Sequence, residues 1–279
     1  MDYTVENIVT SSEDYIARDQ KLPEPKLTKK SIAYDEGLLV DSKWREGIAA
    51  MLEEAKSQAH NSRNDSHQKN TITYFSGALG GYDILAKSKL PELENVKHKS
   101  VTVSFADLKK RFSEHTGIAS EPYENIRPFM HALNIATRGM AHDNNANMVL
   151  DDTLAPAAGT EKQFFERLGA ENKISHVQVY AVALMPDQAR AQARELGMDE
   201  KEAATTARDF CTSFPGLCKA VPDLTLYDKD MHVLYAQKNG KETQHDAAKL
   251  QAWELMCGGA ADGTSIPRIR CDAGRDHQR

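Results

Sequence analysis

The sequence predicts an α/β protein with a doubly wound, mostly parallel sheet and flanking helices. From residue 71 to residue 256, strand-like apolar runs alternate with segments of helical periodicity, which is typical of βαβ units. The run HVQVYAVAL at 176–184 is predominantly apolar, as expected of a strand buried on both faces of a parallel sheet. A glycine-rich segment at 77–81 follows the first run, at the turn where such sheets bind phosphate.

The composition indicates a folded protein, because 40% of the 279 residues are hydrophobic and 27% are charged. The formal net charge of −6 argues against a nucleic-acid partner. The first residues lack the cationic and apolar regions of a signal peptide, and no stretch is long enough to span a bilayer. We therefore expect a cytoplasmic protein without a membrane span. Delivery to another cell by a route other than Sec is the alternative.

Three regions are expected along the chain. Residues 1–40 combine charged residues with Pro23 and Pro25 and show no sustained period, which predicts a loosely structured arm. Residues 41–257 carry the periodic segments and predict one folded domain. Residues 258–279 contain little apolar material, so we expect a poorly ordered tail.

The folded region opens with a helix that begins after Asp41, a residue suited to the N-cap. Helical spacing predicts one buried face, formed by Trp44, Ile48, Met51, Leu52 and Ala55. Strands are predicted at 71–77, 100–105, 147–152, 176–184 and 224–237, the last as two short strands around a turn. Further helices are predicted at 122–140, 160–170, 187–213 and 243–256.

All four cysteines lie in the last quarter of the chain, at Cys211, Cys218, Cys257 and Cys271. Local disulfides or a metal site are the alternatives to free thiols. The spacings lack a CxxC pair, and a chain of this length folds without covalent cross-links, so we expect free thiols.

The segment SGALGGYDILAKS at 76–88 matches the phosphate-binding signature GxxxxGK[ST] only in part. In that signature, glycine amides surround the phosphates, the lysine neutralises them and the hydroxyl binds magnesium. Here the turn is preserved by Gly77, Gly80 and Gly81. The glycine, lysine and hydroxyl positions are occupied by Tyr82, Asp83 and Ile84. An aspartate near the β and γ phosphates predicts impaired ATP binding, unless magnesium offsets its charge.

The order of segments resembles that of the zeta-toxin kinases, a branch of the P-loop kinases. Residues 176–235 are similar to the family's apolar strand ending in a proline, its arginine-bearing helix, its lid and its strand reading LYxxxxxxLY. Earlier segments similar in layout are TITYFSGALGG, SVTVSFADLKKRF and NMVLDDTL. The resemblance covers about residues 70–240 and implies a sheet of the P-loop NTPase or kinase type.

This resemblance implies transfer of the γ-phosphate of ATP, with magnesium, to a nucleotide or nucleotide-sugar substrate. The family's catalytic acid falls at Ala106 or beside it at Asp107. Its arginines match Arg190 and Arg194, which are four residues apart and share one helix face, and a solvated helix face is the alternative.

Two further residues are candidates for the phosphate end of the site. Asp151 closes the third strand, where a carboxylate can hold magnesium; a helix cap or turn acid is the alternative. Lys87 lies one helical turn after Asp83 and is the candidate substitute for the missing lysine, with an ion pair to Asp83 as its alternative.

Two functions are therefore carried forward. One is a zeta-toxin-like phosphotransferase, supported by the order of segments and the arginine-bearing helix. The other is a catalytically inactive pseudokinase that keeps the fold as a binding or effector module for a protein partner, supported by Asp83, Ile84 and Ala106. A bacterial toxin or effector is the expected context of either.

Overall fold

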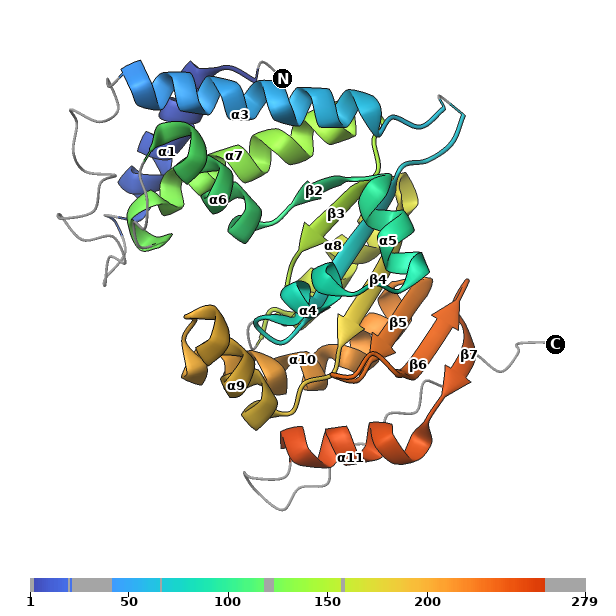
Figure 1. The fold of residues 1–279 in the computed structure, drawn as a ribbon. Helices are drawn as coiled ribbons and strands as arrows, with labels where there is room; N and C mark the ends of the chain where they lie inside the picture. Colours follow the sequence, from blue (N-terminus) through green and yellow to red (C-terminus); the bar gives the residue numbers. More distant parts are fainter. Residues whose placement is uncertain are drawn as a thin grey trace. The chain divides into compact units, whose positions relative to one another are not determined.

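The computed structural model describes residues 3–19, 21, 42–65, 67–117, 123–156 and 159–258. The described strands form one seven-stranded sheet in the order β2-β3-β1-β4-β5-β6-β7 (Figure 1). This mixed, mostly parallel sheet flanked by helices confirms the predicted α/β class. Contacts divide the chain into two compact units, one of Met1–Asn70 with Lys99–Val149 and one of Thr71–His98 with Leu150–Arg279. Both units therefore combine separate stretches of chain.

The first unit is mainly helical. Its elements are α1 (Val5–Asp19), α3 (Ser42–Asn61), β2 (Val101–Val103), α6 (Phe105–Thr116), α7 (Tyr123–Asp143) and the first half of β3 (Met148–Asp151). Trp44 of α3 lies edge-on to Phe112 and Phe129, at ring-centroid distances of 5.1 and 5.4 Å. All the residues predicted for the buried face of α3 are buried, which confirms that prediction.

Helix α1 shows that the prediction of a loose arm is wrong for residues 5–19. Ile8 is buried, and the Tyr3 hydroxyl donates a hydrogen bond of 2.8 Å to Asp143 of α7. The helical period of residues 5–19 does not continue into the charged and proline-containing residues that follow, so the arm as a whole shows no sustained pattern, which explains the wrong prediction. Residues 22–40 of the arm, the predicted N-cap Asp41 and the tail after residue 258 lie outside the described residues.

The second unit holds the larger part of the sheet. β1 (Thr71–Gly77), β4 (His176–Val182) and β5 (Asp223–Tyr227) run parallel to one another. Thr71 pairs with His176, and Gly77 pairs with Val182. β6 (Val233–Lys238) and β7 (Lys241–His245) add antiparallel strands beyond β5.

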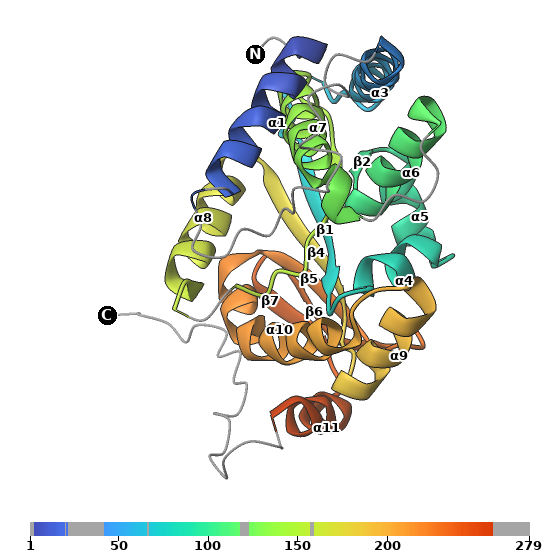
Figure 2. The same cartoon turned by 90° about the vertical axis from the view of Figure 1, so that its left-hand side faces the viewer.

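Helices cover both faces of this part of the sheet. α8 (Glu161–Ile174) lies on one face, and α4 (Gly81–Lys87) and α5 (Pro91–His98) lie on the other (Figure 2). This two-sided cover explains why β1 and β4 are rich in buried residues. The connection from β1 to α4 lies at the carboxyl end of β1.

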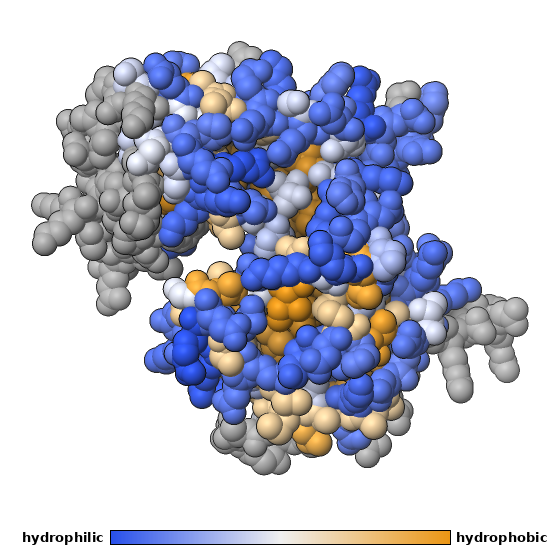
Figure 3. Space-filling model, in the orientation of Figure 1, coloured by the Kyte–Doolittle hydropathy of each residue, from blue (hydrophilic) through white to orange (hydrophobic). Residues whose placement is uncertain are grey.

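Three more helices complete the second unit, namely α9 (Pro186–Leu196), α10 (Glu200–Ala220) and α11 (Ala247–Gly258). Trp253 of α11 packs against Phe210 and Phe214 of α10, with ring centroids 6.1 and 5.7 Å away. Leu255 and Met256 of the same helix are 63% and 57% exposed. Figure 3 shows apolar surface over α11 accordingly.

Capping residues move two predicted boundaries. The expected helix 187–213 is two helices, because Gly197 ends α9 with a φ of 68° and the Asp199 side chain caps the amino end of α10. The expected strand 100–105 ends at Val103. Ser104 is the N-cap of α6, because its hydroxyl accepts a hydrogen bond of 3.0 Å from the Asp107 amide.

Two negative predictions concern the described part of the chain. No helix described there is long and apolar enough to cross a bilayer. Cys211, Cys218 and Cys257 are not joined to one another by a disulfide, and Cys271 lies outside the described residues, so free thiols stay a prediction.

Candidate functional site

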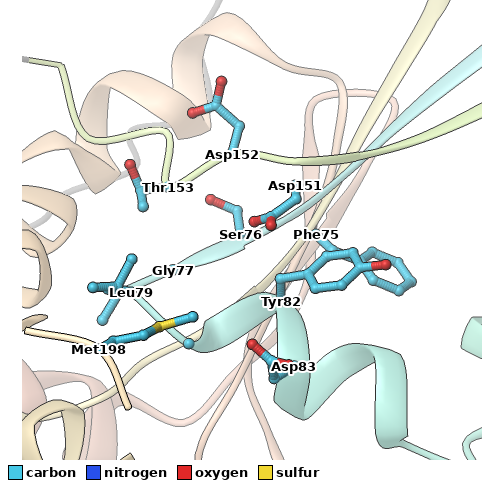
Figure 4. Close-up of a pocket in the computed structure, with 12 residues that line it drawn as sticks. Phe75, Ser76, Gly77, Leu79, Tyr82, Asp83, Asp151, Asp152, Thr153 and Met198 are labelled. Atoms are coloured by element: carbon cyan, nitrogen blue, oxygen red, sulfur yellow. The ribbon is translucent and has the colours of Figure 1, made fainter. Parts of the chain in front are cut away.

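A small cavity lies at the carboxyl end of β1, where the chain turns into α4 (Figure 4). Its wall includes Ser76, Gly77, Gly80, Asp83, Asp151 and Asp152. Ligands of open α/β sheets bind at this end of the strands. The cavity has a volume of about 40 Å³, which accommodates roughly three water-sized groups. It is therefore large enough for a small polar group of a ligand, whereas pockets that enclose a whole drug-sized ligand measure about 300–1,000 Å³.

The connection between β1 and α4 is short and is closed by hydrogen bonds within the protein. Ala78, Leu79 and Gly80 are the three residues between strand and helix. The amide of Gly81 donates to the Ala78 carbonyl oxygen at 2.8 Å. The amide of Leu79 donates to Thr206 Oγ1 of α10 at 3.1 Å. A phosphate cradle needs its loop amides directed at the ligand, and two amides of this turn are directed at protein oxygens instead.

The glycines of this turn are explained by the close approach of neighbouring backbone and side chains. Gly77 has a φ of 125°, and a Cβ added there would lie 2.5 Å from the Val182 carbonyl oxygen of β4. Gly80 has a φ of 90°, and its Cβ would lie 2.9 Å from Gln192 Cγ of α9. A Cβ on Gly81 would lie 2.8 Å from a carbonyl oxygen of β1. Packing alone therefore calls for glycine at all three positions.

Three carboxylates line the cavity, and no lysine, arginine or histidine is among the described residues that line it. Asp83 lies in the first turn of α4, Asp151 ends β3, and Asp152 follows it. Oδ1 of Asp152 accepts a hydrogen bond of 2.9 Å from the Leu154 amide. Two like charges about 4 Å apart repel by about 4 kcal/mol at an effective dielectric constant of 20. An anion that entered the cavity would therefore meet acidic side chains and no basic side chain among the described lining residues.

Ser76 adds a polar group with an unsatisfied hydrogen-bonding capacity. The residue is 2% exposed, and its Oγ is the one buried side-chain nitrogen or oxygen of the described residues that has no hydrogen-bond partner. By contrast, Thr73 on the same strand accepts a bond of 2.6 Å from Gln178 Nε2. Figure 4 shows the Ser76 hydroxyl directed toward the side of the cavity where Asp152 and Thr153 lie. A buried hydroxyl without a partner costs about 1–3 kcal/mol.

The structure brings some of the predicted site residues together and leaves others apart. Those at the cavity are Gly77, Gly80 and Asp151, with Gly81 beside them at the start of α4. Lys87 is an exposed residue at the end of α4 and is not one of the residues that line the cavity. Asp107 belongs to the other unit, in the first turn of α6. The functional roles assigned to these residues stay predictions.

The two arginines predicted for catalysis lie on the side of α9 away from the β1–α4 turn. Gln192 and Leu196 are the α9 residues closest to Gly80. At about 100° per residue, Arg190 and Arg194 project roughly 120–160° around the helix from Gln192 and Leu196. A catalytic role at the cavity would therefore require them to leave the positions they hold in this structure.

Both arginines have acidic partners at the surface. Arg194 donates from Nε and Nη2 to Glu200, at 2.9 and 2.7 Å, and these bonds hold the pKa of Glu200 below its usual value. Arg190 lies 3.4 Å from Asp187 in the same helix. Exposed pairs of this kind contribute about 0–1 kcal/mol to stability, so they are compatible with a solvated helix face.

The fit of ATP and magnesium to this site is poor. The described residues contain no group of three or more His, Cys, Asp or Glu side chains arranged to hold a metal ion. Magnesium is usually bound by one or two carboxylates together with substrate phosphates, so a magnesium role for Asp151 depends on a bound nucleotide. The closed turn and the carboxylates at the cavity disfavour that nucleotide.

Two residues of this site were not predicted from the sequence. Ser76 carries a modest signal, since it is a hydroxyl residue within the otherwise apolar end of a buried strand. Thr206 carries none, because it is 127 residues away from the amide that it binds.

The fold is similar to those of several solved structures. A structure from the PezAT chromosomal toxin-antitoxin system of Streptococcus pneumoniae has a TM-score of 0.52 and 14% identity, over 80% of this chain and 90% of that chain. The AvrRxo1-ORF1:-ORF2 complex with ATP has a TM-score of 0.56 and 12% identity, over 84% and 78%. The same complex with sulphate ions has a TM-score of 0.54 and 13% identity, over 80% and 75%. No family model and no curated protein matches the sequence. At these identities, the comparisons confirm the predicted zeta-toxin-like kinase fold.

Proposed function

We propose that this chain, whose fold is that of the zeta-toxin-like kinases, acts as a binding module and not as a magnesium–ATP phosphotransferase. The observation that carries this proposal is the cavity at the β1–α4 turn, which is lined by three carboxylates and by no basic residue among those described. In a phosphotransferase the same place holds the most negative part of the substrate, and catalysis depends on neutralising it.

Electrostatics support the proposal. Each charged pair of a carboxylate and a phosphate oxygen about 4 Å apart costs about 4 kcal/mol at an effective dielectric constant of 20. The amino end of a helix offers the equivalent of roughly +0.5 charge, which is less than the charge of one ionised carboxylate, and no basic side chain is among the described residues that line the cavity. A magnesium ion offsets two of these charges, and the nucleotide phosphates then remain without the lysine that normally pairs with them.

The geometry of the turn supports the same conclusion. The signature loop wraps the phosphates with successive amides, whereas the Leu79 amide is bonded to Thr206 and the Gly81 amide to Ala78. Opening the turn breaks both bonds before a phosphate can enter. Binding then starts with a loss of about 0.5–1.5 kcal/mol for each bond.

The proposed binding role is supported by the assemblies in which the structural neighbours were solved or described. One belongs to a toxin-antitoxin system, and another was solved as a complex of two proteins, ORF1 and ORF2. We infer by analogy that this chain also has a protein partner, in a bacterial toxin or effector system.

The second candidate function is the family's phosphoryl transfer from ATP to a nucleotide or nucleotide sugar. It is favoured by the meeting of Gly77, Gly80 and Asp151 at one cavity. In this alternative, Asp107 is the base, Arg190 and Arg194 neutralise the phosphoryl group, and Lys87 replaces the missing lysine.

Calorimetric titration with magnesium–ATP separates the two candidates. We expect no binding heat at millimolar nucleotide for the wild type. Asp83→Lys is expected to introduce binding, because it replaces a repulsive charge by an attractive one, and Asp83→Asn is the matched variant that removes charge without adding any. Saturable binding by the wild type, together with phosphoryl transfer that an Arg190→Ala, Arg194→Ala variant loses, would establish the phosphotransferase instead.

A further inference from the structure

Two buried thiols of the second unit lie in contact with one another. Cys211 belongs to α10 and is 4% exposed, and Cys257 belongs to the last turn of α11 and is 5% exposed. The thiol of Cys211 donates a hydrogen bond to the sulfur of Cys257. Cys257 Sγ in turn donates to the Leu184 carbonyl oxygen, which is 3.8 Å away. The two sulfurs therefore meet where α11 packs against α10, although the residues are far apart in the sequence.

Aromatic packing holds the two helices together beside these thiols. The indole of Trp253 on α11 packs against Phe210 and Phe214 of α10, and Phe210 directly precedes Cys211. Nε1 of Trp253 donates a hydrogen bond of 3.2 Å to the Leu184 carbonyl oxygen. A disulfide has Cβ atoms about 3.5–4.5 Å apart. Thiols that packed helices hold in hydrogen-bonding contact are close to that geometry.

The hydrogen bond between the thiols makes them chemically unequal. It holds the pKa of the Cys257 thiol below its usual value, and together with burial it raises the pKa of the Cys211 thiol. The thiolate is the form of cysteine that attacks an oxidant. Cys257 is therefore the attacking sulfur, and Cys211 lies in the position of a resolving thiol, which is an arrangement typical of redox-sensitive cysteines.

We infer that Cys211 and Cys257 form a redox-sensitive pair, which hydrogen peroxide oxidises to a disulfide that links α10 to α11. The Cys257 thiolate attacks a peroxide oxygen, the O–O bond breaks, and the departing hydroxide takes up a proton and leaves as water. The sulfur of Cys211 then attacks the Cys257 sulfenic acid, the S–O bond breaks, and a second water leaves with the Cys211 proton. The two thiols lose two electrons in all, and one peroxide is reduced to two waters.

Contact between the two thiols, and not exposure, selects them for this reaction. Cys218 of α10 is more exposed than Cys211 and Cys257. Helix ends fray, so a molecule as small as peroxide reaches Cys257 when the last turn of α11 opens locally. The inference is independent of ATP binding, because neither member of the pair lines the cavity at the β1–α4 turn.

Peptide mapping of the folded, full-length chain after treatment with hydrogen peroxide tests the inference. Remaining thiols are alkylated, and tryptic peptides are analysed by mass spectrometry without reduction. Cys218→Ala is the form to use, because no lysine or arginine separates Cys211 from Cys218. We expect the peptides of Cys211 and Cys257 to be joined with the loss of two hydrogen atoms. The new cross-link should also raise the melting temperature by at least about 5 °C, because it restricts the unfolded chain.

Two variants distinguish the attacking thiol from the resolving thiol. In Cys211→Ala the Cys257 sulfenic acid has no resolving partner, so dimedone, which reacts with sulfenic acids, should label Cys257. In Cys257→Ala we expect neither a label on Cys211 nor a rise in melting temperature on oxidation. Cys218→Ala is the matched control on the same helix as Cys211 and should keep both the cross-link and the rise. The mapping of the disulfide needs only this control variant, so it does not depend on the folding of the other two.

Three outcomes would overturn the inference. Recovery of Cys211 and Cys257 as alkylated thiols, once the peroxide-treated protein has been unfolded, would show that both are inert buried side chains. A disulfide between Cys257 and Cys271 would assign a different pair. A cross-link between Cys211 and Cys257 that forms in urea but not in the folded protein would show that the packed helices keep the two sulfurs apart.

Discussion

Replacing Gly77 with alanine tests whether the glycines of the β1–α4 turn serve packing. The residue has a φ of 125°, which L-residues rarely adopt, and an added Cβ would lie 2.5 Å from the Val182 carbonyl oxygen. Backbone strain of this kind costs about 1–3 kcal/mol. Overpacking against a backbone that cannot move away adds about 1–3 kcal/mol. We therefore expect Gly77→Ala to destabilise the protein by about 2–6 kcal/mol.

Gly197→Ala is the matched control, because Gly197 also has a positive φ, 68°, but an added Cβ would meet no atom within 4 Å. It carries the strain alone, about 1–2 kcal/mol. Urea unfolding measured through Trp253 fluorescence compares the two in a Trp44→Phe background, since the chain has two tryptophans and Trp253 belongs to the same unit as Gly77. Equal losses in the free energy of unfolding for the two alanine variants would show that the close approach of β4 does not explain the need for glycine at position 77.

Two further predictions concern hydrogen bonds described above. The Leu79 amide donates a hydrogen bond of 3.1 Å to Thr206 Oγ1, and Thr206→Val removes this acceptor. We expect faster hydrogen exchange at the Leu79 amide and a loss of about 1 kcal/mol in the free energy of unfolding. Unchanged exchange at Leu79 would contradict a role for Thr206 in closing the turn. Burial and the hydrogen bond to Asp143 raise the pKa of Tyr3 from 10.0 to about 12. Because the folded protein then holds this proton more tightly than the unfolded chain, stability should fall as the pH rises from 10 to 12. Tyr3→Phe should abolish that part of the decline in urea midpoints, and an equally steep decline in the variant would show that another group causes it.

The fold was predictable from the sequence because it is encoded in local patterns. The apolar runs that form β1, β4, β5 and β6 are buried strands with turn-forming residues around them. β7 has the sequence KETQH and five exposed residues, so it carries neither alternation nor apolar content, and the predicted helix 243–256 was wrong for its residues 243–245. Its pairing with β6 is what defines it as a strand.

The place of the β1–α4 turn was predictable from the sequence, whereas the surroundings of its cavity were not. The glycines located the β1–α4 turn, because glycine is required wherever backbone segments approach closely. Whether those glycines serve a phosphate or a neighbouring strand depends on distances between residues about 100 positions apart, such as Gly77 and Val182. The unpaired state of Ser76 is also a property of the packed structure, since a hydroxyl in a strand usually finds a partner.

The interleaving of the two units has a consequence for how the protein folds. The chain leaves the first unit after Asn70, returns at Lys99 and leaves again after Val149. Strand β1 pairs with β4, and Thr73 and Gln178 of this pair are 105 residues apart. During synthesis on the ribosome, β1 therefore cannot pair with β4 until the whole of the first unit has been synthesised. Long-range parallel pairing of this kind folds slowly and leaves strand edges exposed, so we expect yields of native protein to depend on chaperones and on growth temperature.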